Sequence, residues 1–264
     1  MKFKYLPKIS IVIPVFNTPP KILRECVLSA INQTYKNYEI CIADDYSENK
    51  FTKKEIINLA SKDIRIKVFF SKKHEKISAA SNAALRMTTG DYIGLLDHDD
   101  ILWPNALYEV VKVLNRNPQL ELIYTDEDQI SNDGMAHIEP MIKPSFNFNF
   151  LRTTNYMGHF LVIKKGLVLN VGAFRYGYDG AQDYDLLLRI THKLGIKSNK
   201  VFHIPKILYS WRRSKISTAQ NFSVNKQLAK KYAIFAQRKA LTSDLQKRGI
   251  KGEIIELISK LVVL

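Results

Sequence analysis

Three carboxylates follow a short apolar run near the middle of the chain, at Asp97, Asp99 and Asp100. Carboxylates this close repel one another, so the cluster is costly at a buried strand end unless a cation lies between the oxygens. On an extended strand end, Asp97 and Asp99 point the same way and His98 points the opposite way. Such oxygen ligands suit Mg²⁺ or Mn²⁺. The spacing predicts a cation that Asp97 and Asp99 hold against a diphosphate, without His98; a solvated turn is the plainer alternative.

Three further groups could take part in such chemistry, and each has a structural alternative. Asp44 and Asp45 follow an apolar run and could accept hydrogen bonds from a ribose or a base edge, or could cap a turn. Asp183 begins a predicted helix and could act as a general base, or could simply complement the helix dipole. Trp211 and Arg212 combine an aromatic ring with a cation, which suits contact with a diphosphate and equally suits a solvated strand end.

The elements that must position these residues alternate between strands and helices. Apolar runs predict strands over 9–15, 39–43, 66–70, 92–96 and 120–124, and helical periodicity predicts helices over 22–31, 53–60, 78–87 and 103–114. This alternation indicates a Rossmann-like, doubly wound, mostly parallel α/β sheet covered on both faces. Ligands bind beyond the carboxyl ends of such strands. We therefore expect the polar motifs at 14–17, 44–45 and 97–99 to share one rim.

The second half of the chain loses this rhythm. The segment 125–180 is rich in aromatic residues, Asn and Gly, which predicts a loop-and-hairpin region over the sheet edge where an acceptor could bind. A helix over 182–192 and a strand over 203–209 follow. The segment 217–264 has nine Lys or Arg and three acidic residues and is predicted to be helical.

Composition limits the classes of protein that this chain can be. The formal net charge of +15 over 264 residues fits nucleic acid, an anionic membrane surface or a phosphorylated substrate as partner. The sequence carries no dinucleotide or P-loop fingerprint and no nucleic-acid-binding motif. It also has no signal-peptide pattern and no run of about 18 apolar residues. With two cysteines predicted to lie in the core, we expect a cytoplasmic protein with peripheral contact to the inner face of the membrane.

Ordered motifs across most of the chain resemble those of family 2 glycosyltransferases with the GT-A fold. They lie at 7–17 (PKISIVIPVFN), 29–35 (SAINQTY), 42–47 (IADDYS), 90–93 (GDYI), 97–100 (DHDD), 182–186 (QDYDL) and 203–212 (HIPKILYSWR). The resemblance thus covers residues 7–213. It implies a metal-dependent, inverting enzyme that takes a nucleotide sugar, foremost a UDP-sugar, and extends a glycan or lipid-linked glycan of a surface polysaccharide.

The resemblance also implies roles for particular residues. Pro14, Asn17 and Asp45, or its neighbour Asp44, would line the nucleoside pocket. Asp97 and Asp99 would hold Mn²⁺ or Mg²⁺ against the diphosphate, with Trp211 and Arg212 nearby. Asp183 would deprotonate the acceptor hydroxyl, which then attacks the anomeric carbon opposite the leaving diphosphate.

This sequence departs from the family pattern at two positions. Lys76 stands where members often have Gly, and Ser210 stands where many have a His that could complete the metal site. His203 is the nearest substitute, although a core or sheet-edge position suits it better. The segment 125–128 (TDED) recurs in relatives that build surface polysaccharides; it could order a loop or the acceptor, or form a charged hairpin.

The resemblance predicts one GT-A domain over 1–216, with a nucleotide-sugar-binding half (1–124) and an acceptor-side half (125–216), followed by a basic helical extension (217–264). Three alternatives stay open. The first is a degenerate GT-A module that binds without turnover, which the presence of Asp97, Asp99 and Asp183 argues against. The others are a nucleic-acid-binding protein, suggested by charge, and a metal-dependent phosphotransferase or nuclease using the same acids.

Overall fold

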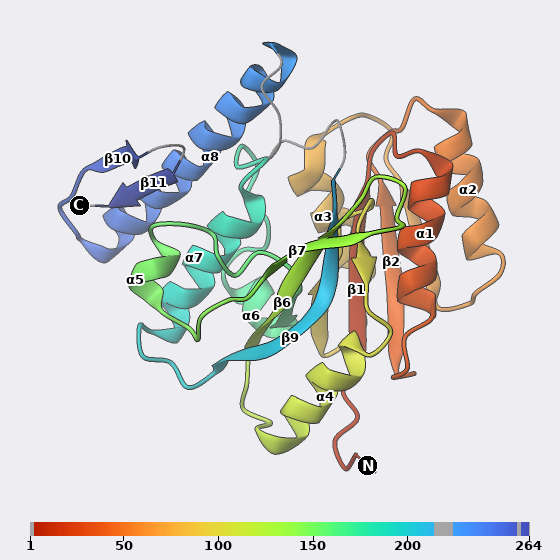
Figure 1. Cartoon of the computed structure of the whole chain (residues 1–264), viewed down its shortest axis with the longest axis horizontal. Helices are drawn as coiled ribbons and strands as arrows, with labels where there is room; N and C mark the ends of the chain where they lie inside the picture. Colours follow the sequence, from red (N-terminus) through yellow and green to blue (C-terminus); the bar gives the residue numbers. More distant parts are fainter. Residues whose placement is uncertain (1–2, 214–223, 258–259, 264) are drawn as a thin grey trace.

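The computed structural model describes residues 3–213, 224–257 and 260–263 as a mixed α/β fold (Figure 1). The strands are β1 (Ile9–Val15), β2 (Tyr38–Asp44), β3 (Ile66–Phe70), β4 (Tyr92–Leu95), β5 (Ile101–Leu102), β6 (Leu122–Ile130), β7 (His137–Met141), β8 (Leu161–Lys164), β9 (Val201–Arg212), β10 (Ile254–Leu257) and β11 (Lys260–Val263). The helices are α1 (Pro20–Ile31), α2 (Lys50–Ala60), α3 (Lys76–Met87), α4 (Ala106–Arg116), α5 (Phe148–Leu151), α6 (Lys165–Asn170), α7 (Gln182–Leu194) and α8 (Val224–Arg248).

The main sheet has the strand order β3-β2-β1-β4-β8-β6-β9-β5, with β7 paired to β6. Strands β1 to β4 run parallel to one another, which confirms the predicted doubly wound arrangement in the first half. Side chains alternate between two cores: Ile11 and Ile13 pack with α1, α2 and α4, whereas Val12 packs with α3, α7 and α8. Both faces are therefore buried, as continuous apolar strands predict.

The predicted loop-and-hairpin region at 125–180 contains more regular structure than the sequence indicated. The short strand β8 runs antiparallel between β4 and β6, in the middle of the sheet. Strand β6 was expected to end at Tyr124 but continues to Ile130 and forms a hairpin with β7. The segment 125–128 does lie in a hairpin, but its side chains are buried, because β6 also pairs with β9 along its length.

The C-terminal helix packs against the domain. Helix α8 buries Ala236, Ala240, Leu241 and Leu245 in the same core as α7, on the side of the sheet opposite α1 and α2 (Figure 1). The expected boundary at 216/217 lies outside the described residues, and the hairpin of β10 and β11 was not predicted. Within the part of the chain that the structure describes, no helix has the length and apolar character to cross a bilayer.

A buried carboxylate joins several segments at the end of the sheet opposite the polar rim. Glu39 of β2 is 3% exposed, lies 2.7 Å from Lys8 and 2.9 Å from Lys67, and accepts hydrogen bonds from Ser10 and Thr89. Burial alone would raise its pKa, but these bonds and the lysine charges lower it well below its usual range.

We expect Glu39→Gln to lower the free energy of unfolding by about 1–3 kcal/mol at pH 7, because buried donors lose a charged acceptor. The folded-state pKa is depressed, so this contribution is present above the unfolded-state pKa and is lost as the pH falls toward the folded-state value. Urea unfolding at several pH values measures it. A difference between wild type and variant that does not narrow below about pH 4 would contradict the assignment.

Candidate active site

The acidic loop after β4 is held by the last strand of the sheet. The Asp97 amide donates to the Tyr209 hydroxyl at 3.3 Å, and Tyr209 donates to Asp100 Oδ2 at 2.5 Å. The Arg212 amide donates to Asp100 Oδ1 at 2.8 Å, and its Nε donates to the carbonyl of Asp99 at 2.7 Å. Each Asp100 oxygen thus accepts a bond. Burial, and then the charges of Asp99 and Asp97, raise the pKa of Asp100 well above its usual value.

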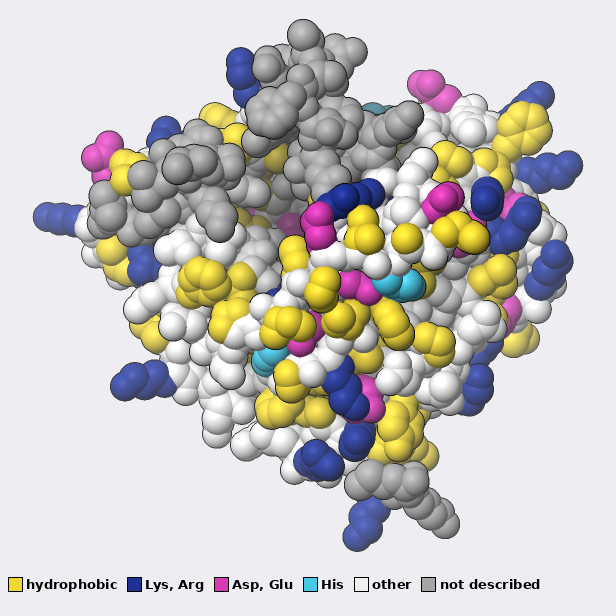
Figure 2. All heavy atoms as spheres, viewed as in Figure 1, with side chains coloured by type: hydrophobic (Ala, Val, Ile, Leu, Met, Phe, Trp, Pro, Cys, Tyr) yellow, Lys and Arg dark blue, Asp and Glu magenta, His cyan; other side chains and the backbone are white. Residues whose placement is uncertain are grey.

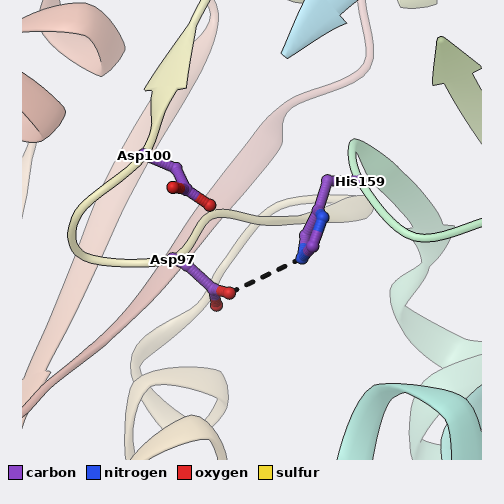
Figure 3. A group of neighbouring side chains, drawn as sticks. All are labelled: Asp97, Asp100 and His159. Atoms are coloured by element: carbon purple, nitrogen blue, oxygen red, sulfur yellow. Dashed lines mark ion pairs between the residues drawn. The ribbon is translucent and has the colours of Figure 1, made fainter. Parts of the chain in front are cut away.

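Asp97, Asp100 and His159 form the cluster with metal-ligand character among the described residues, with one potential ligand atom from each lying within 4.8 Å of the others. Figure 3 shows the Asp97 carboxylate and the His159 ring facing each other, with Asp100 turned toward them. His159 Nε2 lies 3.5 Å from Asp97 Oδ2. Carboxylate oxygens suit Mn²⁺ and Mg²⁺, whereas an imidazole nitrogen better suits softer metals. Both ions nevertheless accept a mixed set of these two ligand types.

The electrostatics of Asp97 and His159 are mutual. The Asp97 side chain is 42% exposed. The neighbouring protein groups remove part of its hydration, which would raise its pKa, but the contact with His159 and the charge of His159 lower the pKa below its usual value. Burial would lower the pKa of His159, but Asp97 and Glu127 raise it well above its usual value. His159 also stacks on Tyr209, with ring centroids 4.8 Å apart. The imidazole therefore lies between two carboxylates.

Asp183 is the second residue of α7. Its Oδ2 accepts a hydrogen bond of 2.7 Å from Asn155 Nδ2. Burial raises the pKa of Asp183; the charge of Asp97 raises it further, while the charge of His159, the Tyr184 amide and Asn155 lower it. Asn155 and His159 lie four residues apart in the chain, so the partner of Asp183 and the partner of Asp97 come from one segment.

The two carboxylates predicted for the nucleoside pocket, Asp44 and Asp45, lie together at the end of β2. Asp44 Oδ2 accepts from the Ser47 amide at 3.0 Å, and its Oδ1 is buried without a hydrogen-bond partner. Asp45 accepts from the Glu75 amide at 2.8 Å and pairs with His74 at 2.8 Å. The two aspartates line one pocket with Phe69, Ser71, Glu75 and Tyr176.

Two residues expected in this pocket have structural roles. Pro14 lies buried within β1. Asn17 adopts a positive φ of 50°, which Asn tolerates better than most residues, and its Oδ1 accepts from the amides of Glu48 and Asn49. Asn17 therefore joins the loop after β1 to the loop after β2, beside the pocket.

The side chains of Asp99, Trp211 and Arg212 lie differently from what the sequence predicted. The Asp99 carboxylate lies 3.7 Å from His98 and outside the cluster of Asp97, Asp100 and His159. Trp211 packs against the hydrophobic core. Arg212 is 1% exposed, and its guanidinium binds Glu25 and two backbone carbonyls, so it fixes the acidic loop and offers no free group to a diphosphate.

The two departures from the family pattern have structural explanations. Ser210 points away from the cluster, since its Oγ accepts from Trp103 Nε1 at 2.9 Å while its neighbour Tyr209 points toward Asp100. His203 is bonded to Asp126 at 2.7 Å and stacks on Tyr124, in the core position expected for it. Lys76 has a φ of 70°, a conformation that Gly adopts without strain.

His159 was missed from the sequence. It is a lone His after Gly158 in an irregular segment, with no partner at a ligand spacing. The faint signal was its position directly before the apolar run 160–163, which becomes β8 beside β4. The placement of β8 in the middle of the sheet brings His159 to the rim.

Comparisons with known proteins give the family of this chain. Residues 10–173 match the model of the family Glycosyl transferase family 2. The uncharacterized protein y4gI of Sinorhizobium fredii is 42% identical over 91% of this chain, and the O-antigen biosynthesis protein RfbC of Myxococcus xanthus is 32% identical over 94%. The chain spans 26% and 19% of the length of these two relatives.

Among solved structures, S. aureus TarS 1–349 in complex with UDP-GlcNAc superposes with a TM-score of 0.65 at 14% identity, covering 91% of this chain and 72% of that one. A sheet of this order, with its acidic loop after β4, defines the GT-A class of fold. Within that class, the chain belongs to glycosyl transferase family 2.

Proposed function

We propose that this chain transfers a sugar from a nucleotide-sugar donor, foremost a UDP-sugar, to a hydroxyl group of a glycan or lipid-linked glycan, with inversion at the anomeric carbon. The observation that carries this proposal is that one short segment holds both Asp183, through a 2.7 Å bond from Asn155, and His159, which lies 3.5 Å from Asp97. A base thus lies beside a group of residues suited to a diphosphate and its cation. The UDP-GlcNAc named for TarS and the O-antigen named for RfbC support the donor and acceptor classes.

Asp183 acts on the acceptor side. Its carboxylate takes the proton of the attacking hydroxyl, and the new bond forms on the face of the sugar opposite the leaving diphosphate. Inversion needs only this one base, because no covalent sugar–enzyme intermediate forms. Asn155 holds one oxygen of Asp183 by a 2.7 Å bond, which leaves the other available to the acceptor.

Asp97 and His159 act on the donor side. They would hold Mn²⁺ or Mg²⁺. Asp99 on the same loop would be the further carboxylate that the family resemblance implies, because both oxygens of Asp100 already accept hydrogen bonds. When bound, the cation neutralises charge on the leaving diphosphate. Asp44 and Asp45 hold the nucleoside, with the unpartnered Asp44 Oδ1 ready to accept from a base or ribose.

The test is a transfer assay on the purified chain with a panel of nucleotide sugars and glycan acceptors, with Mn²⁺ or with EDTA. Acceptor-dependent release of a nucleoside diphosphate supports the proposal. Binding of a nucleotide sugar without turnover would indicate the degenerate module, whereas release of inorganic phosphate or cut strands would indicate a phosphotransferase or nuclease.

The pH dependence of transfer follows from Asp183. A general base works in its ionised form, and burial raises the pKa of Asp183. As the pH is lowered, we therefore expect the transfer rate at saturating donor to begin to fall at a higher pH than an ordinary Asp would give. Asn155→Ala removes a bond to the ionised carboxylate and should move this acidic limb further upward. Rate profiles of both proteins over about pH 4–8 measure it. A limb that does not move in Asn155→Ala contradicts this role.

Contact with anionic lipid is part of the proposal and is based on charge. Lys231 and Lys247 of α8 are exposed, and each basic residue near such a surface contributes about 1 kcal/mol. On the face shown in Figure 2, most of the described Lys and Arg side chains lie around the outline of the molecule. His and several acidic side chains lie nearer the middle of this face. Charge reversal at the two lysines, followed by vesicle sedimentation, tests the contact without removing the buried face of α8.

A further inference from the structure

A single loop carries partners for both halves of the site. Residues 152–160 connect α5 to β8. Near the start of the loop, Asn155 donates to Asp183. Near its end, His159 lies 3.5 Å from Asp97. The relative position of base and cation cluster therefore depends on the conformation of this loop.

Two buried charges lie beneath this loop. Lys143 is 6% exposed and Glu127 is 4% exposed, and they form an ion pair of 3.0 Å. Lys143 Nζ also donates to the carbonyl of Met157 at 2.8 Å and to the carbonyl of His159. Glu127 Oε2 accepts from the His159 amide at 2.9 Å and lies 3.3 Å from the His159 ring at Nδ1. All three ammonium donors are thus used, two of them on the loop backbone.

The backbone of the loop is shaped to pass close to Glu127. Gly158 has a φ of +39°, and a Cβ there would lie 3.2 Å from Glu127 Oε2. A side chain at this position would therefore crowd the carboxylate. Any other residue here would be strained at this φ and would require Glu127 to shift by a few tenths of an ångström.

Stability is a weak reason for such a pair. Replacing a buried ion pair by apolar residues of similar volume is often neutral or stabilising, because desolvation offsets the attraction. The contacts instead control geometry: Glu127 faces Nδ1 of His159 and leaves Nε2 directed at Asp97. Carboxylates behind metal-binding histidines orient the ring, and Glu127 lies 3.3 Å from Nδ1, where it can do so.

We propose that Lys143 and Glu127 are positioning residues that clamp the 152–160 loop, so that His159 Nε2 faces Asp97 while Asn155 holds Asp183. This proposal rests on the proposed function for its consequences in transfer. It concerns residues that touch neither substrate nor reacting atoms, and it assigns a function to the buried acidic segment of β6.

The decisive variant is the double replacement Glu127→Leu/Lys143→Met, which removes both charges together and should fold. We expect its Mn²⁺ dissociation constant, measured by calorimetry with the metal alone, to rise about 10- to 100-fold, and its transfer rate at saturating donor to fall by a similar factor. Amide hydrogen exchange in the 152–160 loop should become faster than in wild type.

Two matched variants separate positioning from stability. Glu127→Gln keeps the shape of a buried glutamate, and Glu39→Gln makes the same change at the far end of the sheet. Both variants should have a lower free energy of unfolding than wild type. Only Glu127→Gln should weaken Mn²⁺ binding and sugar transfer. Lys143→Arg keeps the charge and should retain more transfer than Lys143→Met.

A folded double variant with wild-type Mn²⁺ affinity, transfer rate and hydrogen exchange in the loop would show that Lys143 and Glu127 do not position the 152–160 loop. If the wild-type chain neither binds Mn²⁺ nor transfers sugar, the proposed function fails, and hydrogen exchange in the loop still decides the clamp. Unchanged exchange in the double variant would then reject it.

Discussion

Asp183→Asn should lower the rate of sugar transfer by about 100- to 10,000-fold, the range that a positioned general base contributes. The amide keeps the size of the side chain and can still meet Asn155, but it cannot accept the proton of the acceptor hydroxyl. Because Asp183 acts on the attacking oxygen, we expect the loss in kcat and little change in the KM for the donor. Steady-state transfer at saturating donor and acceptor measures it.

A matched control is Asp63→Asn, which removes one carboxylate just before β3, at the opposite edge of the sheet, where its partner is Arg65. It should leave transfer unchanged within a few-fold. Nucleoside diphosphate should bind Asp183→Asn as tightly as wild type. An Asp183→Asn protein that retains more than about a tenth of the wild-type kcat would exclude Asp183 as the base.

Asp97→Asn should abolish the Mn²⁺-dependent stabilisation of the protein by nucleoside diphosphate. A ligand at 100 times its dissociation constant stabilises the folded state by about 2.7 kcal/mol, so the loss is easily measured by thermal unfolding. The amide of Asn is a poorer ligand for a hard cation than the carboxylate. Losing the carboxylate also removes the negative charge beside His159. Transfer should fall by at least about 100-fold.

Asp99→Asn is the informative comparison. The family resemblance makes Asp99 a ligand, whereas the cluster in the structure is formed by Asp97, Asp100 and His159. If Asp99→Asn weakens Mn²⁺ binding as strongly as Asp97→Asn, the loop rearranges to bring Asp99 to the cation. If only Asp97→Asn and His159→Ala weaken it, the ligand set is that of the structure. Undiminished Mn²⁺ binding in Asp97→Asn would remove the cation from this site.

The sequence was sufficient for features that depend on local pattern. Continuous apolar runs predicted β1, β2 and β4 as strands buried on both faces, and the acids at their carboxyl ends were expected on one rim of these parallel strands, where Asp44 and Asp45 lie at the end of β2 and Asp97 follows β4. A strand buried on both faces has a distinctive composition, so its position needs no knowledge of distant residues.

Features that depend on distant pairing were not predictable in this way. Arg212 is charged and follows an apolar strand, which suggested exposure, but Glu25 lies 187 residues earlier and neutralises it in the interior. Lys143 and Glu127 are likewise buried as partners of each other, with further bonds to the 152–160 loop. Strand β8 has three apolar residues and no turn signal of its own, and its neighbours β4 and β6 define it.

The attachment of the acidic loop to β9 has a consequence for the order in which the protein matures on the ribosome. Tyr209 and Arg212 are the residues that fix Asp97, Asp99 and Asp100, and β5, which ends the same loop, pairs with β9. A nascent chain emerges N-terminal first, so the part of the rim that carries Asp44 and Asp45 can fold long before Tyr209 and Arg212 are synthesised. The conformation of the acidic loop is therefore fixed late in synthesis, when residues 201–212 have left the exit tunnel of the ribosome and paired with β6.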